Sequence, residues 1–99
     1  MMKAIRISVK GKVYKVGYRF YIKQVAEKNG ISGKVFYQRK NQVLIYASGK
    51  PKDLEKFVAL CRLGCPGSVI EHMTITEYKA IAETQIMEIT ENQQIISNQ

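Results

Sequence analysis

The residues of this chain best suited to chemistry lie between Gly11 and Arg19, in the stretch Gly-Lys-Val-Tyr-Lys-Val-Gly-Tyr-Arg. An alternating apolar run ends just before this stretch, and a pattern with helical period begins just after it. A turn from a strand into a helix points several backbone N–H groups at one spot, where the helix dipole adds positive potential. Arg19 can hold an anion there through two parallel hydrogen bonds. The stretch therefore predicts a phosphate-binding turn, although a glycine-containing turn can also simply connect two elements.

Hydrophobic periodicity predicts the elements on both sides of this turn. Ile5, Ile7 and Val9 alternate with polar residues, which indicates a half-buried strand. After the turn, apolar residues recur every three or four positions, as on one face of a helix. Asn29-Gly30 ends that helix, because glycine readily takes the left-handed conformation found at helix ends. The apolar stripe of this helix consists of Tyr18, Tyr21, Ile22, Val25 and Ala26.

A hairpin, a second helix and two more strands are expected downstream. Residues 31–38 and 42–48 read as strands joined by the polar turn at residues 39–42. Proline suits the first turn of a helix, so Pro51 marks the start of a helix that ends at the turn-rich residues 64–67. The apolar stripe of that helix consists of Leu54, Phe57, Val58 and Cys61. Residues 69–77 read as a fourth strand, with Met73 and Ile75 inward and His72 and Thr74 outward, and residues 85–89 as a short fifth one.

The order β-α-β-β-α-β with a short extra strand is typical of a ferredoxin-like α+β sandwich, in which two helices cover one face of an antiparallel sheet. We predict one such domain over residues 1–90 and a frayed tail over residues 91–99, which are rich in asparagine and glutamine. The strand residues expected to face the helices are Ile5, Ile7, Val9, Val35, Val43 and Ile45. Those expected on the opposite, open face are Arg6, Lys10, Lys34, Phe36, Leu44 and Tyr46.

The net charge of +8 is unevenly distributed along the 99 residues. All 16 lysines and arginines lie in residues 1–79, together with five of the eight acidic residues, whereas residues 80–99 contain no base. A body this basic attracts anions such as small phosphates, nucleic acids or acidic surfaces. The same charge can also serve solubility alone, so charge by itself does not identify the partner.

Composition excludes several classes of protein. An apolar content of 45% is ordinary for a globular domain. No apolar run approaches the ~18 residues of a membrane span, and the N-terminal alternation is too polar for a signal peptide. We therefore expect a cytoplasmic monomer that does not bind membranes. Cys61, Cys65 and the single histidine, His72, do not have the spacing of a disulfide framework or of a zinc site.

With this order of elements, the opening stretch resembles the signature of the acylphosphatase family, G-x-V-Q-G-V-x-(F or Y)-R. Further glycine and proline positions fall in the family's order and spacing, so the resemblance covers roughly residues 3 to 90. The matching positions are Gly11-x-Val13-x-x-Val16-x-Tyr18-Arg19, Gly33-x-Val35, Gly49-x-Pro51 and Gly64-x-Pro66-Gly67.

The resemblance implies a small hydrolase that cleaves the carboxyl–phosphate bond of acyl phosphates to carboxylate and phosphate, with no metal or organic cofactor. Its partner would be an acyl phosphate or inorganic phosphate. Arg19 would bind the phosphate oxygens, while an asparagine on the second strand would orient the attacking water. Catalysis of this kind is mostly positioning and electrostatic stabilisation. The phosphate cradle would be the backbone of Tyr14, Lys15, Val16, Gly17 and Tyr18.

The chain departs from the family pattern at two places. The family's Q-G is Tyr14-Lys15 here, which removes a glycine and can strain the turn, although Lys15 adds charge beside the phosphate. The family's G-W-V-R-N is Gly33-Lys34-Val35-Phe36-Tyr37, so Tyr37 takes the place of the catalytic asparagine. Tyrosine offers one hydroxyl where an amide offers a donor and an acceptor, and such a loss commonly costs about 10²–10³-fold in rate. Asn41, in the hairpin turn, is not expected to take over this role.

Three functions therefore remain open. The first is a working acylphosphatase, with full or weakened activity. The second is a module that binds phosphate without turnover. The third, less favoured by the sequence, is nucleic-acid binding through the basic and aromatic open sheet face, because such faces stack bases in RNA-recognition domains. The strand consensus of those domains is absent from residues 34–37.

Overall fold

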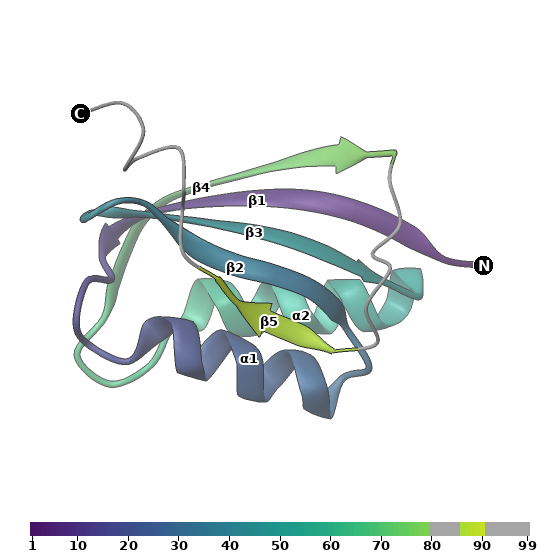
Figure 1. The fold of residues 1–99 in the computed structure, drawn as a ribbon, viewed down its shortest axis with the longest axis horizontal. Coiled ribbons are helices and arrows are strands. Elements are labelled where there is room, and N and C mark those ends of the chain that lie inside the picture. Colours follow the sequence, from purple (N-terminus) through teal and green to yellow (C-terminus); the bar gives the residue numbers. More distant parts are fainter. Residues whose placement is uncertain (80–85, 91–99) are drawn as a thin grey trace.

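The computed structural model describes residues 1–79 and 86–90, and its elements follow the predicted order (Figure 1). They are β1 (Lys3–Lys12), α1 (Tyr18–Lys28), β2 (Ser32–Arg39), β3 (Gln42–Gly49), α2 (Pro51–Leu63), β4 (Val69–Tyr78) and β5 (Met87–Ile89). The ferredoxin-like βαββαβ arrangement and the short fifth strand are thus confirmed. The predicted start of that strand at Gln85 and the predicted tail over 91–99 lie outside the described residues.

The described strands form one sheet in the order β4-β1-β3-β2-β5. β1 pairs antiparallel with both β3 and β4, and β2 pairs antiparallel with β3. β5 pairs parallel with β2, so its addition makes the predicted antiparallel sheet a mixed one. Both helices of the described residues lie on the same side of this sheet, so no described helix covers the other face (Figure 1).

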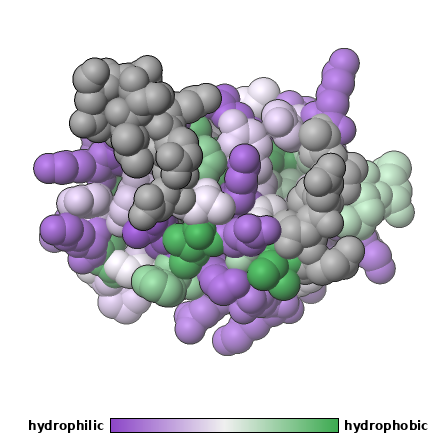
Figure 2. Space-filling view, in the orientation of Figure 1, coloured by the Kyte–Doolittle hydropathy of each residue, from purple (hydrophilic) through white to green (hydrophobic). Residues whose placement is uncertain are grey.

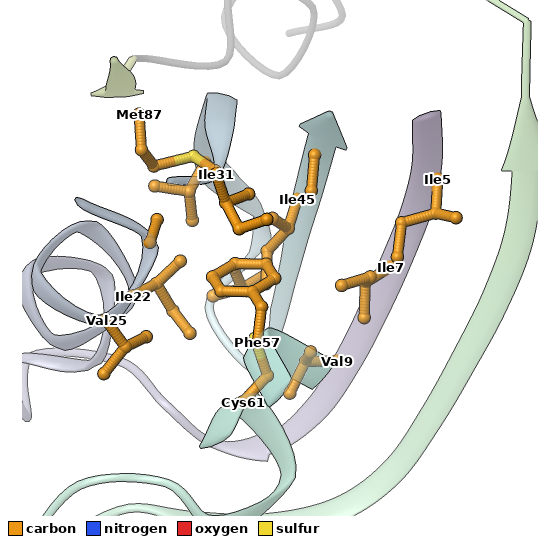
Figure 3. Close-up of a cluster of buried hydrophobic side chains, with 14 of the residues drawn as sticks. Ile5, Ile7, Val9, Ile22, Val25, Ile31, Ile45, Phe57, Cys61 and Met87 are labelled. Carbon is orange, nitrogen blue, oxygen red and sulfur yellow. The ribbon is translucent and has the colours of Figure 1, made fainter. Parts of the chain in front are cut away.

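The core fills the space between the sheet and the two helices. All six strand residues predicted to face the helices are buried. Figure 3 shows Phe57 and Cys61 of α2 pointing towards the sheet residues Ile7, Val9 and Ile45. Burial raises the pKa of the Cys61 thiol, so this cysteine stays protonated and acts as a small apolar residue, as the sequence predicted.

Leu44 lies on the open face, as predicted, but it is buried there. The register places Leu44 on the open face, beside Phe36 of β2 and Ser8 of β1, but its side chain is only 4% exposed. We attribute this burial to its place in β3, a central strand with neighbours on both sides.

Ile75, predicted to point inward, does share a face with the buried Ile7, yet it is 43% exposed. It lies on β4, at the edge of the sheet, where a hollow of about 510 Å³ separates it from Leu54 and Val58 of α2. The inward direction of Ile75 was therefore predicted correctly, but the helices do not extend far enough to cover it.

Hydrophilic side chains dominate the surface seen in Figure 2, with smaller hydrophobic patches between them. No helix in the described part of the chain is long and apolar enough to cross a membrane.

The end of β1 carries a bulge that positions the loop leading into α1. The pairing of β1 with β4 shifts between Lys10 and Gly11, and Gly11 has a φ of 148°. A side chain at Gly11 would collide with the backbone carbonyl of Val69 on β4, so only glycine fits. The Gly11 N–H donates to the Asn41 carbonyl at 2.9 Å. The loop after β1 and the turn between β2 and β3 therefore lie at the same end of the sheet.

Candidate functional site

The loop between β1 and α1 brings backbone N–H groups, the positive end of a helix dipole and Arg19 close together. Lys15 and Gly17 both take left-handed conformations, with φ of 57° and 82°. Gly17 is the N-cap of α1, and no side chain among the described residues caps the helix. The first turn of the helix contains no acidic residue. The first N–H groups of a helix have no acceptor within it, and the helix dipole is positive at this end. With Arg19 in the first turn, the loop has the donors and the charge to hold an anion.

Contacts with α2 and the turn after it hold the loop in place. Val13 is fully buried, and the Cys65 thiol donates to the Val16 carbonyl at 3.6 Å. The Tyr18 hydroxyl donates to the Cys61 carbonyl at 2.8 Å, which fastens the start of α1 to α2. Burial, with a smaller contribution from the nearby Cys61, raises the pKa of Tyr18, so its hydroxyl remains a donor. The side chain of Tyr18 thus belongs to the core, and only its backbone belongs to the loop.

The side chain of Tyr37 points into this loop. Its hydroxyl accepts a hydrogen bond from the Lys15 N–H at 3.1 Å and donates one to the Val13 carbonyl at 3.3 Å. One of the backbone amides predicted to form the cradle therefore already has an acceptor inside the protein. Tyr37 lies on β2 one residue beyond Phe36, so its side chain takes the helix-facing side of the sheet.

Arg19 lies over the ring of Tyr37. The guanidinium carbon is 4.1 Å from the ring centroid, which is a close cation–π contact. The one ion pair in the described part of the chain joins Lys23 to Glu27, so no acidic side chain neutralises Arg19 there. The guanidinium is therefore held in place by an aromatic ring and keeps its charge available to an anion.

Two further cations surround the loop. The ring of Tyr14 lies 5.0 Å from that of Tyr37, and the ammonium groups of Lys15 and Lys40 lie 5.4 and 5.8 Å from the Tyr14 ring centroid. Tyr14, Lys15 and Tyr37, three of the residues that depart from the family pattern, are thus linked by these ring and cation–π contacts. Lys40 was not predicted from the sequence to lie near the loop. Its position follows from the hairpin turn between β2 and β3, because the antiparallel sheet brings this turn to the end where β1 enters the loop.

Asn41 does not join the loop through its side chain in the described structure. It lies in the turn of the hairpin, and its backbone carbonyl accepts the hydrogen bond from Gly11. The polar groups found inside the loop come from Tyr37 and from the backbone of Val13 and Lys15.

Replacing Lys15 with glycine is expected to stabilise the fold by about 0.5–1 kcal/mol. A left-handed conformation costs a residue with a side chain about 1–2 kcal/mol, whereas glycine loses roughly 0.5–1 kcal/mol of that gain in backbone entropy. Thermal unfolding measures the change, and a gain of about 1 kcal/mol raises Tm by about 4–8 °C in a domain of this size. Lys15→Ala is the matched control, because it removes the charge but keeps the backbone penalty. If Lys15→Gly and Lys15→Ala raise Tm equally, the left-handed backbone of Lys15 does not strain the fold.

The chain matches the family model described as Acylphosphatase over residues 5–89. Among curated proteins, an acylphosphatase from Thermotoga maritima is 33% identical over 76 residues, which are 77% of this chain and 84% of that protein. An acylphosphatase from Bacillus subtilis is 31% identical over 80 residues, 81% of this chain and 88% of that protein. Among solved structures, an acylphosphatase from Bacillus subtilis has a TM-score of 0.84 at 29% identity, covering 91% of this chain and 99% of that one.

Proposed function

Because the chain belongs to the acylphosphatase family, we propose that it hydrolyses acyl phosphates in the loop between β1 and α1. The observation that supports this site best is the left-handed turn at Lys15 and Gly17, followed directly by Arg19 and the uncapped start of α1. An acyl phosphate carries its negative charge on the phosphoryl oxygens, which match backbone N–H groups and a guanidinium.

In the proposed reaction, water attacks phosphorus and the bond from phosphorus to the acyl oxygen breaks. The products are a carboxylate and inorganic phosphate, and the proton of the water is released to solvent. The backbone from Tyr14 to Tyr18 holds the phosphoryl group, and Arg19 stabilises the charge on its oxygens. These groups act by position and electrostatics, and neither gains nor loses a proton.

Tyr37 sets the rate of this reaction in our proposal. Its hydroxyl lies at the loop, bonded to the Lys15 N–H. The resemblance to the family signature implies an asparagine side chain at this position of β2. A phosphoryl oxygen that binds the Lys15 N–H must displace this hydroxyl. A single hydroxyl also orients a water less completely than an amide, which has both a donor and an acceptor arm. We therefore expect slow turnover.

A second candidate function follows from the same contact. With the Tyr37 hydroxyl bonded to Val13 and Lys15 and its ring under Arg19, the chain can act as a phosphate-binding module without turnover. In this second function the loop still binds the anion, but no side chain orients a water well enough for it to attack phosphorus.

Hydrolysis of benzoyl phosphate, with inorganic phosphate as inhibitor, tests the proposal and separates the two candidates. Turnover above the uncatalysed rate with competitive inhibition by phosphate supports the hydrolase. Phosphate binding in a calorimetric titration without turnover would instead favour the binding module. If the folded protein neither turns over benzoyl phosphate nor binds phosphate, the loop is not an anion site and both candidates are wrong.

A further inference from the structure

A row of aromatic rings crosses the sheet face that the helices leave open. Phe36 of β2 and Tyr46 of β3 are stacked, with ring centroids 6.0 Å apart and planes 16° from parallel. Tyr46 contacts Tyr78 of β4 edge to face at 5.0 Å. The register explains how Tyr46 and Tyr78 meet across β1: the residue paired with Tyr78 is Ala4, whose small side chain leaves room between them. These three rings are called the aromatic row below.

Cations lie along the same row. The ammonium group of Lys34 is 5.3 Å from the ring centroid of Tyr46 and 5.9 Å from that of Phe36. Arg6 of β1 is paired directly with Tyr46 and therefore shares its face. Among the strand residues that the register pairs on this face, within the described part of the chain, Glu88 beside Lys34 is the one acidic residue. Local charge is thus positive, in a chain with a net charge of +8.

The row is accessible to a ligand. Tyr78 is 44% exposed, Lys34 is exposed, and Phe36 and Tyr46 are half-buried, so each of these residues keeps some surface in contact with solvent. Aromatic faces beside cations suit flat rings that carry a negatively charged backbone, which describes the bases and phosphates of nucleic acids. A duplex hides the faces of its bases, whereas a single strand can present them to a protein.

We propose that the open sheet face binds single-stranded nucleic acid, with bases stacked on the aromatic row and phosphates held by Arg6 and Lys34. This function is separate from acyl phosphate hydrolysis. Tyr37, one residue along β2 from Phe36, points to the other side of the sheet, so the phosphate loop and the aromatic row lie on opposite faces. Both sites can therefore be occupied at once.

Fluorescence anisotropy with a labelled oligouridine of about 12 nucleotides tests the proposal, because site sizes for such surfaces run to about 16 nucleotides. The affinity is expected to fall as salt rises from about 50 to about 200 mM, since binding releases counterions. Tyr46→Ala is expected to weaken binding about tenfold or more through lost stacking. Tyr46→Phe keeps the ring and should bind as wild type does. Lys34→Ala should weaken binding and lower the slope of log affinity against log salt by about 0.7.

Lys56→Ala, which removes an exposed lysine of α2 on the other side of the sheet, is the matched control and should leave the affinity unchanged. Unchanged benzoyl phosphate hydrolysis in Tyr46→Ala would show that this variant is folded. If it does not fold, the exposed Lys34 still provides the test.

Three binding results would each overturn the proposal, and so would one result on self-association. The three binding results are the absence of salt-sensitive binding to the single strand, equal binding by Tyr46→Ala and Tyr46→Phe, and tighter binding to a duplex of the same length. Self-association of the chain that Tyr46→Ala abolishes would also overturn it, because the face would then belong to a second copy.

Discussion

Replacing Tyr37 with asparagine is expected to raise kcat/KM for benzoyl phosphate by about 10–100-fold. One well-placed polar group at a reaction centre commonly contributes about 10²–10³-fold to the rate, and the tyrosine hydroxyl supplies part of that already. The amide has both a donor and an acceptor arm, so it can hold a water and direct it at phosphorus. Steady-state hydrolysis of benzoyl phosphate by wild type and variant measures the change.

The same substitution removes the contacts that occupy the loop. Without the Tyr37 hydroxyl, the Lys15 N–H loses the acceptor that lies 3.1 Å away, and it becomes available to a phosphoryl oxygen. Arg19 loses the ring 4.1 Å below its guanidinium and can turn towards the ligand. Part of the expected rise in kcat/KM therefore comes from a lower KM, and part comes from a higher kcat.

Tyr37→Phe is the matched control for these two effects. It keeps the ring under Arg19 and removes only the hydroxyl, so inorganic phosphate should inhibit it more strongly than it inhibits the wild type. No gain in kcat is expected, because phenylalanine cannot orient a water. If Tyr37→Asn folds but turns over no faster than wild type, Tyr37 does not occupy the water-orienting position.

Replacing Arg19 with alanine is expected to lower kcat/KM by about 10²–10³-fold or more. Arg19 is the first charged side chain of α1, and within the described residues it has no acidic partner, so its charge is available to the phosphoryl group. Arg19→Lys should recover little, because an ammonium group is a point charge and cannot make the two parallel hydrogen bonds of a guanidinium. The hydrolysis rates of wild type, Arg19→Lys and Arg19→Ala test this prediction: wild type should be much faster than both variants.

Lys28→Ala provides the control for charge on the same helix. Lys28 is exposed in the last turn of α1, far from the loop, so its loss should leave hydrolysis unchanged. An equal fall in rate for Arg19→Ala and Lys28→Ala would mean that overall charge attracts the substrate and that Arg19 has no specific role.

Much of the fold could be predicted from the sequence because local patterns and tertiary packing agree. The alternation of Ile5, Ile7 and Val9 and the helical spacing of Leu54, Phe57 and Cys61 mark surfaces that are buried in the structure. The burial of Leu44 could not be predicted from alternation, because alternation gives the face of a strand but not the position of that strand in the sheet. Likewise, the parallel pairing of β5 with β2 depends on contacts between segments distant in sequence.

The candidate site was only partly predictable, for a similar reason. The glycine-containing turn and Arg19 are adjacent in sequence, so their proximity follows from the local pattern. The contact of the Tyr37 hydroxyl with Lys15 and Val13 joins residues more than 20 positions apart, and it depends on side-chain length and loop conformation. The position of Lys40 over Tyr14 similarly depends on how the hairpin turn packs against the loop.

The most direct test of the central claim is a phosphate titration of the ¹⁵N-labelled protein, followed by the backbone amide resonances. We predict that the amides of residues 14–19 shift together on one saturable binding curve, and that the Lys15 amide moves at lower phosphate in Tyr37→Phe than in wild type. No shift in these amides, or an equal shift in Arg19→Ala and wild type, would contradict the account that this loop and Arg19 bind the phosphate group.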